Sequence, residues 1–198
     1  RERWATPDGD FVDVDTTSHP VAPDAPLLVL FHGLEGSSAS HYARAFAHWA
    51  AAAGVALAVP HFRGCSGPLN LGPRAYHSGD FEEIGWILGQ LRLRSAGPLQ
   101  AVGISLGGNA LLRYLGEHGT GARHLSAAAT VSAPLDMRAG GAALSRGFRS
   151  LICLPLCDES RSFGLLALLG ADTRPVKDDE VQLLQELADN LAFGIGTI

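Results

Sequence analysis

The feature that most constrains this chain is a serine set between a predicted strand and a predicted helix. Leu99–Val102 is a predicted strand, and Leu111, Leu112 and Leu115 recur at helical spacing after it. Between them stands Gly103-Ile104-Ser105-Leu106-Gly107, whose small residues two before and two after the serine leave room for a strained turn. The pattern predicts that Ser105 is a nucleophile presented at the carboxyl end of a buried strand.

Other apolar runs alternate with helical patterns up to about residue 148. Leu27–Phe31 and Ala56–Val59 predict strands that are buried on both faces, and Ala127–Val131 predicts another strand. Phe11–Asp15 alternates apolar and polar residues and predicts an exposed first strand. Residues 42–53 carry apolar side chains at helical spacing, with a glycine at position 54 to end the helix. Strands separated by helices predict an α/β fold, in which a mostly parallel sheet is flanked by helices.

The pattern changes after residue 148. Leu151–Cys157 and Phe163–Leu169 are apolar runs around a short polar turn, which predicts an antiparallel β-hairpin. Asp178–Glu180 then begin a helix whose apolar stripe runs from Val181 to Ile195. We therefore expect an α/β core over residues 1–148, extended by a hairpin and helix over residues 149–198. The Gly-rich stretch 138–143 is the expected hinge.

Composition argues against several classes of function. Hydrophobic residues make up 46% and charged residues 18% of the chain, which is typical of a folded protein. The net charge of -5 is spread without a basic block, so no nucleic-acid partner is expected. No apolar stretch approaches the roughly 20 residues of a membrane helix. Three sparse cysteines favour a reducing, cytoplasmic compartment.

No cofactor or metal ion is expected either. His41 and His48 lie on one predicted helix about 10 Å apart, too far to share an ion. The chain also has no Gly-rich phosphate loop that ends in lysine.

A second motif predicts the other half of a hydrolytic site. His32-Gly33-Leu34-Glu35-Gly36 directly follows the strand Leu27–Phe31, so it belongs at the same edge of the sheet as Ser105. Acyl transfer requires backbone N–H groups that stabilise a developing oxyanion. We expect the N–H groups of Leu34 and Leu106 to form this oxyanion hole.

Five motifs in this order resemble the YheT-like α/β-hydrolases, over about residues 3–148. They are His32–Ser38, His61–Gly67, Tyr76–Asp80, Gly103–Asn109 and Val131–Asp136. The resemblance implies an α/β-hydrolase-type fold and esterase activity toward short- or medium-chain acyl groups.

The last fifty residues resemble a different family. Leu151–Ile198, with Phe163-Gly164-Leu165-Leu166 in its second strand, is similar to the C-terminal part of a GAF domain. The half of a GAF domain that usually builds the ligand pocket has no counterpart here. The resemblance therefore implies no cyclic-nucleotide or chromophore site.

The general base and the acid are harder to assign. In this fold the acid and then the histidine follow the nucleophile along the chain. Only His118 and His124 follow Ser105. His118 is expected about 20 Å away along the next helix, and His124 precedes the next strand, at the opposite end of the sheet.

Upstream histidines are the alternatives. His32 and His61 each follow a buried strand at the Ser105 edge. We favour structural roles for both. For His32 this role is to hold the oxyanion loop, the segment Gly33–Gly36 that follows it. His77, in the loop Tyr76–Asp80, is the candidate base. Asp136 is the candidate acid or orienting group, with a helix cap as its alternative role.

The sequence thus predicts a serine carboxylesterase with an incomplete or rebuilt triad, acting on a small-molecule ester. The alternative is a catalytically impaired remnant that serves as a binding or regulatory module. The hairpin and helix after residue 148 are suited to cover the sheet edge that follows Val131, within one chain or exchanged between two. We therefore expect a homodimer or higher homo-oligomer, in which a partner could bring a histidine to Ser105.

Overall fold

A computed structural model of the chain describes residues 1–134, 150–157, 162–170, 181–182 and 185–186. The chain divides into two compact units, Arg1–Ala133 and Pro134–Ile198. Both the predicted boundary at residue 148 and the predicted hinge 138–143 lie outside the described residues.

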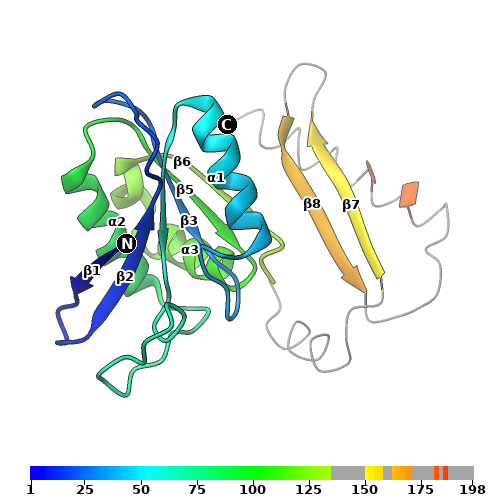
Figure 1. The fold of residues 1–198 in the computed structure, drawn as a ribbon. Helices are drawn as coiled ribbons and strands as arrows, with labels where there is room; N and C mark the ends of the chain where they lie inside the picture. Colours follow the sequence, from blue (N-terminus) through cyan, green and yellow to red (C-terminus); the bar gives the residue numbers. More distant parts are fainter. Residues whose placement is uncertain (135–149, 158–161, 171–180, 183–184, 187–198) are drawn as a thin grey trace. The chain divides into compact units, whose positions relative to one another are not determined.

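The first unit is built on a six-stranded sheet in the order β1-β2-β4-β3-β5-β6 (Figure 1). The strands are β1 (Glu2–Ala5), β2 (Phe11–Thr16), β3 (Leu27–Phe31), β4 (Ala56–Pro60), β5 (Leu99–Ile104) and β6 (Leu125–Val131). β3 pairs in parallel with β4 and β5, and β5 pairs in parallel with β6. β2 pairs antiparallel with β1 and β4. The prediction of an α/β fold with a mostly parallel sheet is confirmed.

Helices cover both faces of this sheet (Figure 1). They are α1 (His41–Ala53), α2 (Phe81–Arg94) and α3 (Leu106–His118), followed by the short 3-10 helix η1 (Gly119–His124). Leu28 and Leu30 of β3 pack in one core with residues of α1. Val29 and Phe31, on the opposite face, pack with residues of α2 and α3. Burial on both faces explains why β3 is a continuous apolar run.

The prediction of an exposed first strand over Phe11–Asp15 is wrong. β1 pairs along the outer side of β2, and Asp13 on β2 is buried. Arg3 on β1 donates from two guanidinium nitrogens to the two Asp13 carboxylate oxygens, each over 2.8 Å. A polar residue in an alternating strand is thus buried here because the neighbouring strand provides its counter-ion.

The described part of the second unit contains an antiparallel hairpin, β7 (Ser150–Cys157) and β8 (Ser162–Gly170), as predicted. Most of the predicted final helix lies outside the described residues, although 181–182 and 185–186 are helical. Within the described ranges, no helix is long and apolar enough to span a membrane.

Candidate active site

Ser105 occupies the turn between β5 and α3, at the carboxyl end of the central strands. Its backbone has φ 51° and ψ -115°, a positive φ that non-glycine residues rarely adopt and that costs of order 1–3 kcal/mol. The Ser105 N–H donates to the carbonyl oxygen of Val131 over 2.8 Å, which ties this turn to the end of β6. The strain and its support are typical of a nucleophile held on a sharp strand-to-helix turn.

The two flanking glycines are required by close backbone contacts. A Cβ at Gly103 would lie 2.5 Å from the Cα of Gly108. A Cβ at Gly107 would collide with the carbonyl oxygens of His32 and Phe31. The glycine spacing around Ser105 therefore lets α3 begin directly against β3 and β5.

The loop after β3 lies against Ser105. A Cβ at Gly33 would be 3.3 Å from the Cβ of Ser105, so the two segments are in contact. Leu106 is the first residue of α3, and the first N–H groups of a helix have no acceptor within the helix. In the part of the chain that the structure describes, the Leu34 N–H has no acceptor either. Two unengaged amides thus belong to the segments that meet at the serine.

His32 is a neutral, fully engaged side chain. Its Nδ1 donates to the Gly33 carbonyl oxygen over 2.8 Å, and its Nε2 accepts the Phe62 N–H over 3.0 Å. Burial lowers the pKa of His32 to about 4. Because both ring nitrogens are engaged, this histidine connects the loop after β3 to the segment after β4 and has no nitrogen to offer Ser105.

His61 is buried beside it, with the two ring centroids 6.0 Å apart. Its Nε2 lies 2.9 Å from Asp15 Oδ2, and its Nδ1 lies 3.3 Å from the Cys65 carbonyl oxygen. Hydrogen bonds from Arg1 hold the pKa of Asp15 well below its usual range, so this partner is a carboxylate. Both nitrogens of His61 are therefore engaged as well.

His77 is exposed, and its Nδ1 accepts the Gly79 N–H over 3.2 Å. In the neutral ring the proton then sits on Nε2, so abstraction of a serine proton requires the ring to reorient. All eight histidines lie in the described residues, and none of them hydrogen-bonds Ser105 there. The candidate acid, Asp136, lies outside the described residues.

Two tyrosines that the sequence motifs did not assign to the site hold the loop after β3. The Tyr42 hydroxyl accepts the Gly33 N–H over 3.0 Å. The Tyr76 hydroxyl accepts the Glu35 N–H over 3.0 Å and donates to Glu35 Oε1 over 2.6 Å. These partners are separated by 9 and 41 residues, so no local spacing pattern reveals them.

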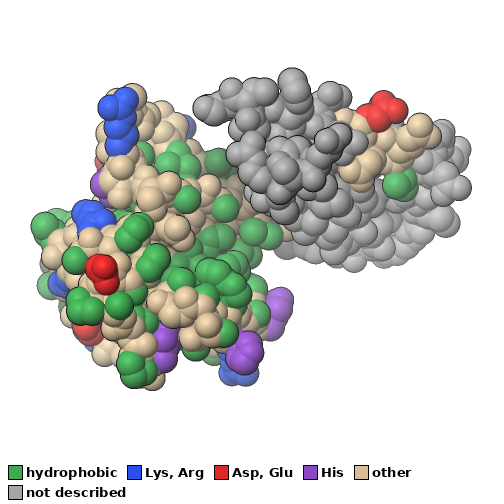
Figure 2. All heavy atoms as spheres, turned by 90° about the horizontal axis from the view of Figure 1, so that it is seen from above, with side chains coloured by type: hydrophobic (Ala, Val, Ile, Leu, Met, Phe, Trp, Pro, Cys, Tyr) green, Lys and Arg blue, Asp and Glu red, His purple; other side chains and the backbone are tan. Residues whose placement is uncertain are grey.

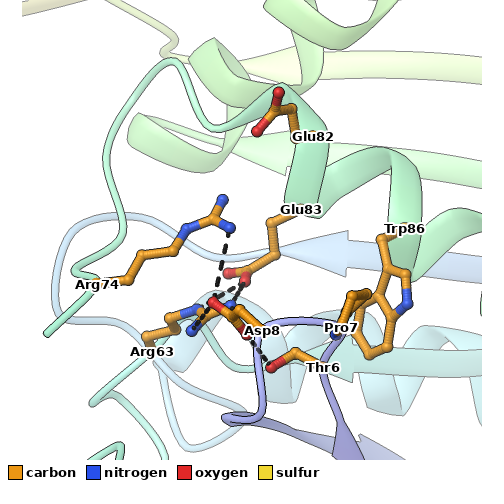
Figure 3. Close-up of a pocket in the computed structure, with 8 residues that line it drawn as sticks. All are labelled: Thr6, Pro7, Asp8, Arg63, Arg74, Glu82, Glu83 and Trp86. Carbon is orange, nitrogen blue, oxygen red and sulfur yellow. Dashed lines mark hydrogen bonds and ion pairs between the residues drawn. The ribbon is translucent and has the colours of Figure 1, made fainter. Parts of the chain in front are cut away.

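A separate cavity of about 220 Å³ lies at Arg63, between the β1–β2 turn, the segment after β4 and α2 (Figure 3). The buried Arg63 guanidinium forms ion pairs with Asp8 at 2.9 Å, Asp10 at 3.1 Å and Glu83 at 2.7 Å. The lining of this cavity contains none of the predicted site residues. The ion pairs anchor the loop that carries Tyr76 and His77 to the first hairpin and to α2.

On the face shown in Figure 2, the arginine side chains of the first unit are scattered among apolar and neutral groups. The expectation of no nucleic-acid partner stays a prediction.

Comparison of the chain with known families gives two results. The GAF domain family model matches residues 91–195, a stretch that includes β5, α3 and β6 as well as the hairpin β7–β8. YheT of Escherichia coli (strain K12), whose name assigns it provisionally to the esterases, is 44% identical over 150 residues, covering 74% of this chain and 44% of YheT. Phospholipase ABHD3 of Homo sapiens is 34% identical over 125 residues, covering 62% of this chain and 30% of that protein. The chain spans less than half the length of these relatives.

Solved structures show the same fold. An α/β serine hydrolase without a lid from Xanthomonas campestris has a TM-score of 0.52 at 18% identity, covering 69% of this chain and 62% of that one. An esterase from Pyrococcus furiosus has a TM-score of 0.55 at 18% identity, covering 75% and 56% of the two chains. The α/β-hydrolase fold predicted from the motifs is therefore confirmed.

Proposed function

Because the chain belongs to the YheT-like α/β-hydrolases and, through residues 91–195, to the GAF domain family, we propose that it is a serine carboxylesterase. One observation carries the proposal. Ser105 stands at a positive φ on the strand-to-helix turn, in contact with a loop that offers a free backbone amide. This combination of strained serine and unengaged N–H groups suits attack on an ester carbonyl.

In the proposed reaction, Ser105 Oγ attacks the carbonyl carbon of a short- or medium-chain acyl ester. The N–H groups of Leu34 and Leu106 stabilise the negative charge on the carbonyl oxygen. The bond to the alcohol then breaks, the alcohol leaves with a proton, and an acyl ester of Ser105 remains. Water attacks this ester, releases the carboxylic acid and returns the proton to Ser105.

His77 is the proposed base, because its imidazole is exposed, whereas His32 and His61 are buried with both ring nitrogens engaged. Asp136 is the proposed acid or orienting group. We also propose that residues 149–198 complete the hydrolase core of residues 1–148, within one chain or by exchange in a homodimer.

A second candidate function is a binding or regulatory module that has lost catalysis. It is favoured by the finding that, within the described residues, no histidine hydrogen-bonds Ser105. In that case the hydrolase fold would present a surface rather than an active site.

Labelling with a fluorophosphonate, followed by mass mapping of the modified residue, separates the two functions. We expect labelling at Ser105 and hydrolysis of p-nitrophenyl acetate. Ser105→Ala should lower this hydrolysis by about 10³-fold or more. The matched control Ser18→Ala changes an exposed serine in the loop before β3 and should keep the wild-type rate.

An activated ester suits this test because its leaving group departs without protonation, so only the activation of Ser105 depends on the base. His77→Ala should slow hydrolysis by about 10²-fold, while His48→Ala, exposed on α1, should not. A folded protein that is neither labelled nor active would refute the esterase proposal and support the binding module.

A further inference from the structure

Three consecutive backbone amides lie in the loop that contacts Ser105, and they differ in whether their N–H groups have an acceptor. The outer two, of Gly33 and Glu35, each donate to a tyrosine hydroxyl over 3.0 Å. The middle amide, of Leu34, has no acceptor within the described residues. The two tyrosines thus fix the backbone on both sides of the Leu34 N–H, which is the one of these three amides that has no acceptor among the described residues.

The outer position at Glu35 is strained. Its φ is 52°, in the left-handed region that non-glycine residues avoid. Glu35 is exposed, so packing around its side chain does not account for this conformation. Tyr76 contacts this residue twice, accepting its N–H and donating to its carboxylate over 2.6 Å. The pair of hydrogen bonds specifies both the backbone and the side chain of Glu35.

The Tyr76 ring is itself held in place. It stacks on Phe62, with ring centroids 5.2 Å apart and an interplanar angle of 4°. Phe62 is buried and donates its N–H to His32, the residue that opens the same loop. A closed set of contacts therefore runs from His32 through Phe62 and Tyr76 to Glu35.

We propose that Tyr76 is a positioning residue for the proposed oxyanion hole, holding the strained turn at Glu35 so that the Leu34 N–H can donate to the oxyanion formed at Ser105. This inference rests on the proposed esterase function. Tyr76 touches no reacting atom. Its hydroxyl acts through the backbone of the oxyanion loop.

The test removes only the hydroxyl. Tyr76→Phe keeps the ring that stacks on Phe62, and Tyr114→Phe is a matched control because Tyr114 is buried on α3 with its hydroxyl near His124. For p-nitrophenyl acetate hydrolysis we expect Tyr76→Phe to lower kcat by about tenfold or more and to leave KM within about twofold of wild type. Tyr114→Phe should change neither.

Two further measurements separate positioning from a general loss of structure. Glu35→Gln keeps an acceptor for the Tyr76 hydroxyl and should retain most of kcat. Glu35→Ala removes this acceptor and should lose most of kcat. Amide hydrogen exchange, followed by NMR, should show the Glu35 N–H exchanging about tenfold faster in Tyr76→Phe than in wild type or Tyr114→Phe.

The exchange measurement does not depend on catalysis. An inactive wild type would refute the esterase proposal, while the exchange rates would still decide whether Tyr76 holds the loop. Wild-type exchange at Glu35 in Tyr76→Phe would overturn the inference, and so would a wild-type kcat for this variant in an active enzyme.

Discussion

The His32 imidazole combines complete burial with two hydrogen bonds that only a neutral ring can make. Nδ1 donates to Gly33, while Nε2 accepts from Phe62. A second proton would break the bond from Phe62 and place a charge in the core, and burial accordingly lowers the pKa to about 4. The unfolded chain, with a histidine pKa near its ordinary 6.5, takes up this proton first as the pH falls.

We therefore expect the contribution of His32 to stability to be complete above about pH 6.5 and to be lost as the pH falls toward 4. Urea unfolding should show a loss of about 2 kcal/mol from this residue between about pH 7.5 and 5. His32→Gln should reduce the pH dependence by this amount, while His48→Gln, at an exposed position on α1, should leave it unchanged. An equal pH dependence in His32→Gln and wild type would contradict the assignment.

At the level of single elements, two of the three glycines of α3 have opposite surroundings. Gly107, in its first turn, lies against the backbone of β3, whereas Gly116, in its last turn, is exposed, and a Cβ added there would meet no atom within 4 Å. Gly107→Ala should destabilise the protein by about 3 kcal/mol, because backbone atoms cannot move aside for the methyl group. Gly116→Ala should stabilise it by about 0.5–1 kcal/mol, because alanine loses less conformational freedom in a helix.

The two substitutions are matched in size and lie on one helix, so thermal unfolding of both variants tests the packing directly. Equal effects would show that α3 does not approach β3 as closely as described.

Elements whose signal is local were predictable from the sequence. The continuous apolar run of β3 and the strand-to-helix turn at Ser105 are encoded within a few residues. β1 was not predicted, because Glu2–Ala5 becomes a strand only by pairing with β2 and by the ion pair of Arg3 with Asp13. The contact of Tyr76 with Glu35 could not be predicted for the same reason. A contact between distant residues depends on the folded loops, which periodicity does not describe.

In the whole molecule, the sheet of the first unit ends at β6. Within the described residues, β6 pairs only with β5, and its central residues Ser126–Ala129 are exposed. An unpaired edge strand of small apolar residues is a template for pairing with another chain.

We therefore expect the protein to form a homodimer or higher homo-oligomer. Size-exclusion chromatography with light scattering should give at least twice the mass of the 20.7 kDa chain. Ala128→Lys, which places a charge on the exposed edge, should shift this mass toward the monomer. A monomer at every concentration tested would contradict the expectation.

The hydrogen bond from Ser105 to Val131 gives this edge strand a second significance. Because the strained turn is tied to the last residue of β6, fraying of β6 removes one of the restraints that hold Ser105 at its positive φ. Part of the free energy that holds Ser105 at its positive φ therefore comes from the pairing of β6. This edge strand opens at a lower cost than the central strands. Under the proposed esterase function, heating should therefore inactivate the protein through fraying of β6 before the core unfolds.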